Sequence, residues 1–144
     1  MEKVKKYKPK IDRLFWIIWS IVTIILVPCT IIALSDWVSG IILILTDIFT
    51  YYFMITSLVA YVELRENTMY VKFGFILKRE IPYEKIIKIE KEKKVMSYSM
   101  LSIKNSYEHY NIRYNKYDMI TVSVVDNEDL IKELKLRNNN IKGI

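Results

Sequence analysis

Few residues of this 144-residue chain have the types and spacings that catalysis or metal binding requires. His109 is the only histidine and Cys29 the only cysteine, so the sequence indicates neither a zinc site nor a Ser-His-Asp arrangement. Glycine occurs only three times, which is too few for a glycine-rich, phosphate-binding loop. We therefore expect no metal ion, no cofactor and no enzymatic activity.

Asp47 has the most unusual position, because it lies within a long apolar run. A carboxylate at the centre of a membrane span costs about 2.5–3.5 kcal/mol on insertion scales. One hypothesis makes Asp47 the contact for a cationic peptide, an ion or a partner helix. The other hypothesis makes it structural, either snorkelling outward or protonated beside Thr46 and Thr50. The preceding apolar run contains no Lys or Arg to pair with it.

Two groups of basic residues are candidates for contact with anionic lipid, because juxtamembrane Lys and Arg contribute up to about 1 kcal/mol each. The second group is interleaved with Glu84, Glu90 and Glu92, so a solvated edge strand explains it equally well. The candidates are Lys3, Lys5, Lys6, Lys8, Lys10 and Arg13 in the first group, and Lys85, Lys88, Lys91, Lys93 and Lys94 in the second.

The net charge of +6 and the eleven tyrosines raise the question of nucleic-acid binding. Basic grooves with stacked aromatic side chains do hold single-stranded nucleic acid. However, three of the tyrosines belong to an apolar run, and others alternate along expected strands, where tyrosine is common. We therefore expect no nucleic-acid partner.

Two apolar runs must position these candidates. Leu14–Leu34 contains no charged residue, and its length of roughly 31 Å at ~1.5 Å per residue matches the hydrocarbon core of a bilayer. A polar break, Ser35–Gly40, separates it from Ile41–Tyr61. All three tryptophans fall near the expected ends of these runs, as is typical of membrane interfaces. The sequence therefore predicts a transmembrane helical hairpin over residues 14–61.

The basic flank predicts how the hairpin is oriented. Lys and Arg precede the first run and are missing between the two runs, so the positive-inside rule places both termini in the cytoplasm. Residues 1–13 are then a basic cytoplasmic tail, and 62–144 form a cytoplasmic domain of a multi-pass cell-membrane protein. The alternative is a signal peptide cleaved near Ser35, but the first apolar run is longer than the usual ~7–15 residues.

From Val62 onward the alternating pattern is typical of strands. Residues 95–106 are ambiguous between a short helix and a strand. His109 lies on an expected strand, where we predict a surface or half-buried side chain. The fold class is α+β: a two-helix transmembrane hairpin followed by an antiparallel β-meander or partial barrel closed by a C-terminal helix. The expected strands are 62–66, 69–73, 75–81, 87–90, 110–114 and 120–124, with one helical turn at 82–85 and a helix that follows Asp126 and ends before Asn138.

Residues 60–141 resemble small bacterial PH-like domains of the YyaB-like type. The resemblance rests on Ile81–Ile86 and on Ser106–Tyr117, which is similar to that family's Ser-Leu-Asp-Arg-Leu-x-Ile-x-Tyr-Gly-Lys-Tyr stretch. His109 stands where Arg is usual, and Asn115 where Gly is usual. The resemblance implies a PH-like fold. It also implies that the domain is a binding scaffold and does not catalyse a reaction.

The resemblance implies a membrane-anchored binding or adaptor module that meets lipid headgroups or a membrane protein. Some small membrane-bound PH-like proteins protect bacteria against peptide bacteriocins, so an immunity protein that intercepts a peptide is the alternative. Packing between spans or between exposed sheet edges would allow a homo-oligomer.

Overall fold

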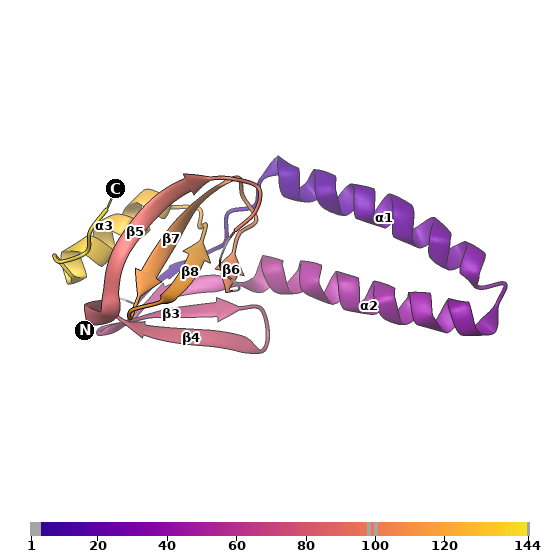
Figure 1. The fold of residues 1–144 in the computed structure, drawn as a ribbon, viewed down its shortest axis with the longest axis horizontal. Helices are drawn as coiled ribbons and strands as arrows, with labels where there is room; N and C mark the ends of the chain where they lie inside the picture. Colours follow the sequence, from indigo (N-terminus) through magenta and orange to yellow (C-terminus); the bar gives the residue numbers. More distant parts are fainter. Residues whose placement is uncertain (1–3, 98, 100, 144) are drawn as a thin grey trace.

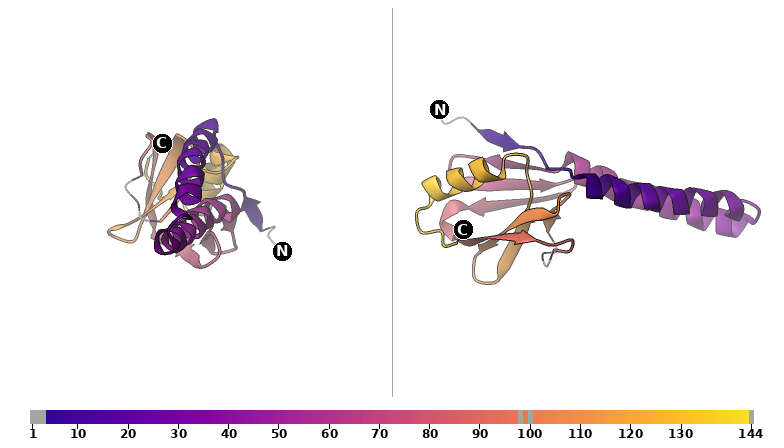
Figure 2. Two further views of the ribbon diagram at one scale, coloured as in Figure 1. Left: turned by 90° about the vertical axis from the view of Figure 1, so that its right-hand side faces the viewer. Right: turned by 90° about the horizontal axis from the view of Figure 1, so that it is seen from above.

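A computed structural model of the chain describes residues 4–97, 99 and 101–143. Two long helices project side by side from one end of a β domain, and a third helix lies at the opposite end (Figures 1 and 2). The long helices are α1 (Arg13–Ala33) and α2 (Trp37–Val59), and the third is α3 (Asn127–Arg137). This arrangement confirms the predicted α+β class, with its N-terminal helical hairpin and its C-terminal helix.

The turn between α1 and α2 is shorter than the expected polar break. The Asp36 carboxylate caps α2, because its Oδ2 accepts hydrogen bonds from the Ser39 backbone N–H at 3.0 Å and from Ser39 Oγ at 2.5 Å. The helix therefore begins at Trp37, four residues before Ile41. Both helices are long and apolar enough to cross a membrane, and only 6% of the most apolar window of each is buried. Neither helix is thus a core helix of the domain.

The β domain consists of two four-stranded sheets (Figure 1). All strand pairs are antiparallel except β6–β8, which is parallel, so the sheet departs there from a simple meander. The first sheet has the order β1 (Lys5–Tyr7), β2 (Tyr61–Leu64), β3 (Thr68–Phe73), β4 (Leu77–Pro82). The second has the order β5 (Ile86–Lys93), β7 (Glu108–Tyr114), β8 (Asp118–Val122), β6 (Ser102–Ile103). A single 3₁₀ turn, Tyr83–Lys85, joins the two sheets at the predicted position.

Residues 5–7 are not part of a free tail, which corrects the prediction of a basic tail over residues 1–13 for this part of it. Strand β1 pairs with β2, and Tyr7 lies opposite Val62. Tyr7 is buried, and its hydroxyl donates a 2.7 Å hydrogen bond to Asp129 Oδ2 on α3. Lys5 Nζ lies 2.6 Å from Glu133 Oε1 on the same helix. Strand pairing and these contacts attach residues 5–7 to the domain.

The predicted closure by a C-terminal helix is confirmed. Helix α3 buries Leu130, Ile131 and Leu134 in the same hydrophobic core as the inner faces of both sheets. Among its described residues, the ambiguous segment 95–106 contains the two-residue strand β6 and no helix. The strand expected at 75–81 begins at Leu77, because Gly74, with φ +77°, opens a turn that extends to residue 76.

Candidate functional site

The helical hairpin and the domain are joined without a flexible linker. Only Ala60 separates α2 from β2. Ahead of α1, the Asp12 backbone N–H donates to Asn105 O at 2.9 Å, and Asp12 Oδ2 accepts from the Tyr107 N–H at 3.0 Å. The buried Asn105 amide in turn donates to Ser57 O of α2 at 2.8 Å. Hydrogen bonds therefore hold both helices to one loop of the domain. These bonds fix the orientation of the domain relative to the helices.

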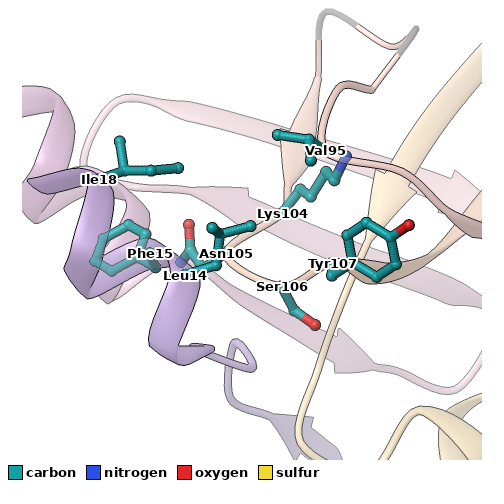
Figure 3. Close-up of a pocket in the computed structure, with 8 residues that line it drawn as sticks. All are labelled: Leu14, Phe15, Ile18, Val95, Lys104, Asn105, Ser106 and Tyr107. Carbon is teal, nitrogen blue, oxygen red and sulfur yellow. The ribbon is translucent and has the colours of Figure 1, made fainter.

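A small cavity lies at this junction, between the first turns of α1 and the segment around residue 105 (Figure 3). Its volume is about 70 Å³. Sites that enclose a whole small molecule measure ~300–1,000 Å³, so this cavity admits one chemical group at most. The lining residues are Leu14, Phe15, Ile18, Val95, Lys104, Asn105, Ser106 and Tyr107.

Lys104 gives this largely apolar cavity a positive charge. Its Nζ is buried and has no hydrogen-bond partner among the described residues. Burial lowers the pKa of Lys104, because the ammonium loses its hydration, and the charge of Glu92 offsets part of that effect. A buried ammonium is costly unless it is paired, so an anionic group that entered the cavity would be stabilised.

His109 is fully buried, which contradicts the prediction of a surface or half-buried side chain. Its Nδ1 lies 3.3 Å from Tyr107 O, and its Nε2 lies 3.4 Å from Glu92 Oε2. Burial, followed by the nearby charge of Lys104, lowers the pKa of His109. The imidazole is therefore neutral near pH 7.

A chain of hydrogen-bonded polar side chains crosses β8, β7 and β5 of the second sheet and includes Ser97, which follows β5. Thr121 Oγ1 donates to Asn111 Oδ1 at 2.6 Å, and the Asn111 amide donates to Glu92 Oε2 at 2.8 Å. Ser97, on the segment between β5 and β6, contacts Thr121 at 2.7 Å. Hydrogen bonds from Lys94 and Asn111 lower the pKa of Glu92 to about 2. Within residues 4–97, 99 and 101–143, no three His, Cys, Asp or Glu side chains are grouped to hold a metal ion.

The second group of basic candidates is not one continuous patch. Strand β5 begins at the end of the domain remote from α1 and α2 and ends beside them (Figure 1), so Lys85 and Lys88 are far from the helices. The pairs are Lys88–Glu90 at 2.5 Å, Lys91–Glu108 at 2.8 Å, Lys93–Glu108 at 3.6 Å and Lys94–Glu92 at 2.5 Å. This pairing is typical of a solvated strand, so the run alone is a weak lipid-contact candidate.

The first group of basic candidates is likewise dispersed. Lys5 pairs with α3, and Lys6 Nζ lies 3.8 Å from the centre of the Tyr61 ring. Lys8 and Lys10 lie on the segment that connects β1 to α1, and Arg13 is the first residue of α1. Lys3 lies outside the described residues. Of this group, Arg13 is the residue placed directly where the helix leaves the domain.

Asp47 contacts the other long helix. Its Oδ2 accepts a 2.7 Å hydrogen bond from Thr30 Oγ1 of α1. Thr46, which the sequence offered as a neighbour, instead donates to Ile42 O of its own helix. Because α2 begins at Trp37 and not at Ile41, Asp47 lies about 15 Å along the helix, near its middle. The remaining oxygen, Oδ1, is buried without a hydrogen-bond partner in the described part of the chain.

Sequence reasoning missed the residues that line the junction. Lys104 lies in the ambiguous segment 95–106, where nothing in the sequence distinguishes it from other lysines. The apolar triplet Phe75–Leu77 was assigned to a strand, whereas Phe75 and Ile76 form an exposed turn. A signal was present, because this triplet follows Gly74 and is flanked by Lys72 and Lys78.

Two four-stranded sheets closed by a C-terminal helix, with an apolar hairpin clamped to one end, define a PH-like scaffold joined to two candidate membrane spans. The bacterial PH domain family matches residues 60–138, which is more than half of the chain. The chain therefore belongs to the bacterial PH domain family. This confirms the resemblance at the level of the family, and the YyaB-like type stays a prediction. Neither the curated proteins nor the solved structures include a significant match to this chain.

Proposed function

We propose that this protein is a non-enzymatic binding or adaptor module that α1 and α2 anchor in the cell membrane, with both termini in the cytoplasm. The observation that carries the proposal is the clamp between Asp12, Asn105 and Ser57, which joins the domain directly to both helices. With the helices in a bilayer, this clamp holds one end of the domain against the lipid surface. Whatever the domain binds would then be met at the membrane.

The cavity beside Lys104 is the binding site that we favour. It combines apolar walls with a buried, unpartnered ammonium group in the described part of the chain. It also lies against the first two turns of α1, which by the proposed topology is the level of the lipid headgroups. An anionic group of a lipid headgroup matches both its charge and its position. A membrane protein or peptide with an acidic group is the second class of partner, and no described contact favours the immunity alternative over it.

The proposal can be tested by photocross-linking of the full chain in native membranes. A photoreactive amino acid would replace Tyr107, which lines the cavity and is 47% exposed. The matched control would replace Tyr117, an 85% exposed tyrosine on the turn between β7 and β8. Membranes would be washed with alkaline carbonate before irradiation, and the adducts analysed by mass spectrometry.

We expect the chain to stay in the washed membranes and to form lipid or membrane-protein adducts from position 107 and not from position 117. Release of the chain by alkali would contradict the membrane anchor. Retention with equal adduct yields from both positions would contradict the cavity as the binding site, while leaving the anchor intact.

A further inference from the structure

The turn between β3 and β4 presents large apolar side chains to the outside of the domain. Phe75, Ile76 and Leu77 are 53%, 77% and 58% exposed. They form one contiguous stretch of chain at the tip of a hairpin. Isolated exposed apolar residues need no explanation, but a cluster at a hairpin tip indicates an interaction surface.

This tip lies alongside α2. The Phe75 ring is 6.1 Å from the Tyr52 ring, centre to centre, and Gly74 is packed so closely on Thr56 that an added Cβ would lie 2.4 Å from Thr56 Cβ. Tyr52 is seven residues from the end of α2 at Val59, which is about 10 Å by helical rise. The hairpin tip therefore extends roughly 10 Å beyond the level at which α2 enters the domain.

A second apolar tip lies beside α1. Val95 and Met96, in the turn that follows β5, are 60% and 81% exposed. Val95 lines the cavity together with Ile18, which is five residues into α1, or about 8 Å from its start (Figure 3). One apolar loop tip thus lies beside each helix of the hairpin.

Basic residues stand immediately behind both tips. On the first hairpin, Lys72 lies opposite Lys78, one pair of residues behind Phe73 and Leu77. On the second, Lys93 and Lys94 directly precede Val95. The first arrangement suits a bilayer boundary, because the apolar side chains can bury in acyl chains while the ammonium groups of Lys72 and Lys78 meet anionic headgroups. Lys93 and Lys94 are already paired with Glu108 and Glu92, so the second tip depends mainly on its apolar side chains.

We propose that both tips, Phe75–Leu77 and Val95–Met96, insert into the headgroup–acyl boundary of the leaflet that α1 and α2 enter. This inference rests on the proposed membrane anchor. The protrusion of ~10 Å at the first tip agrees with the ~5–10 Å depth at which interfacial apolar faces are buried. Deeper insertion is opposed, because backbone groups of the Gly74–Ile76 turn need water or another hydrogen-bond partner. Insertion of the two tips would fix the tilt of the domain relative to the membrane and hold the Lys104 cavity against the lipid surface.

The test uses an environment-sensitive nitrobenzoxadiazole reporter on single cysteines in the full chain. Cys29 is exposed on α1 and reports on the span. In a Cys29→Ser background, Ile76→Cys reports on the tip and Tyr117→Cys on the turn between β7 and β8, which lies away from the helices. Each labelled protein is reconstituted into vesicles of neutral and anionic phospholipid that carry a nitroxide either near the headgroup or deep in the acyl chain.

We expect the headgroup-level nitroxide to quench the reporter at position 76 several-fold more strongly than the reporter at position 117. The deep nitroxide should quench most strongly at position 29. If position 29 is quenched while 76 behaves like 117, the insertion is overturned and the anchor stands. If position 76 is shielded from lipid nitroxide and from aqueous iodide alike, protein covers the tip, and the inference is also overturned. Absence of quenching at all three positions would contradict the anchor itself.

Discussion

The Thr30 hydroxyl, three residues from the end of α1, donates a 2.7 Å hydrogen bond to the Asp47 carboxylate near the middle of α2. A second polar contact, from the Tyr51 hydroxyl to Thr23 Oγ1 at 3.1 Å, joins the same helices nearer the domain, about one turn further along α2 and two turns back along α1. Lipid offers no hydrophobic driving force between helices, so such contacts contribute to helix pairing. Asp47 thus has a structural role in the hairpin, whatever else it contacts.

Thr30→Val should weaken the hairpin because it removes the donor to Asp47. Interhelical hydrogen bonds in membranes contribute about 0.6 kcal/mol on average and up to ~1.7. We expect a coupling of that size in a double-mutant cycle with Asp47→Leu, which removes the acceptor, measured by thermal unfolding in detergent micelles. Thr46→Val is the matched control, since the Thr46 hydroxyl bonds only within α2 in the described structure. Equal effects of Thr30→Val and Thr46→Val would contradict the interhelical role.

Gly74→Ala should destabilise the protein for two reasons. Gly74 has φ +77°, a backbone conformation that is strained for alanine. The new Cβ would also lie 2.4 Å from Thr56 Cβ. We expect the free energy of unfolding to fall by about 1–3 kcal/mol. Lys78→Ala, an exposed change on the same hairpin, should alter it by less than ~0.5 kcal/mol. Similar denaturation midpoints for the two variants would argue against close packing of the tip on α2.

Tyr7→Phe tests whether the N-terminal segment is part of the sheet. The substitution removes the hydrogen bond from the Tyr7 hydroxyl to Asp129 and leaves the ring in place. We expect a loss of about 1 kcal/mol, because the Asp129 side chain is 48% exposed and can recover water. Tyr117→Phe, at an exposed position, is the control and should be neutral in chemical denaturation. A neutral Tyr7→Phe would indicate that residues 5–7 are a free tail in solution.

His109 should make stability depend on pH in one defined window. The pKa of His109 is lowered from its ordinary value of 6.5, because the ring is buried and lies near Lys104. Below about pH 6.5 the unfolded chain takes up a proton that the folded chain does not, so stability should fall as the pH decreases. Glu92 contributes at lower pH, because its pKa is lowered from the ordinary 4.5 to about 2. Protonation of Glu92 as the pH falls through this range removes the stability that its hydrogen bonds provide.

The measurement is thermal unfolding in detergent at pH 8, 7, 6 and 5.5. The unfolding temperature of the wild-type chain should be the same at pH 8 and pH 7 and should fall at pH 6 and 5.5. His109→Gln should flatten the lower part of this profile even if its overall stability is reduced. A profile of the same slope in the variant would show that other groups cause the pH dependence.

The sequence predicted the fold because its strongest patterns are local. The length and apolar character of the first two runs predict helices, and alternation from Val62 onward predicts most of the strands. Asp126, followed by apolar residues at helical spacing, predicts α3. Each of these signals depends only on residues that are close in the chain.

The details of the site depend on contacts that are distant in sequence. Strand β1 is only three residues long and is stabilised by β2 and α3, so its own sequence carries no sufficient signal. The burial of His109 depends on neighbours from other parts of the chain, such as Glu92 of β5 and Lys104. The partner of Asp47 depends on the rotation of α1 about its axis. These features require tertiary structure, which periodicity alone does not contain.

The most direct test of the central claim is cysteine accessibility in intact bacterial cells. In a Cys29→Ser background, Val38→Cys marks the first turn of α2, at the end of the hairpin remote from the domain, and Tyr117→Cys marks the domain. A membrane-impermeant maleimide should label position 38 in intact cells and position 117 only after the membrane is permeabilised. Labelling of position 117 in intact cells, or of position 38 only after permeabilisation, would contradict a hairpin that spans the membrane and holds the domain on its cytoplasmic face.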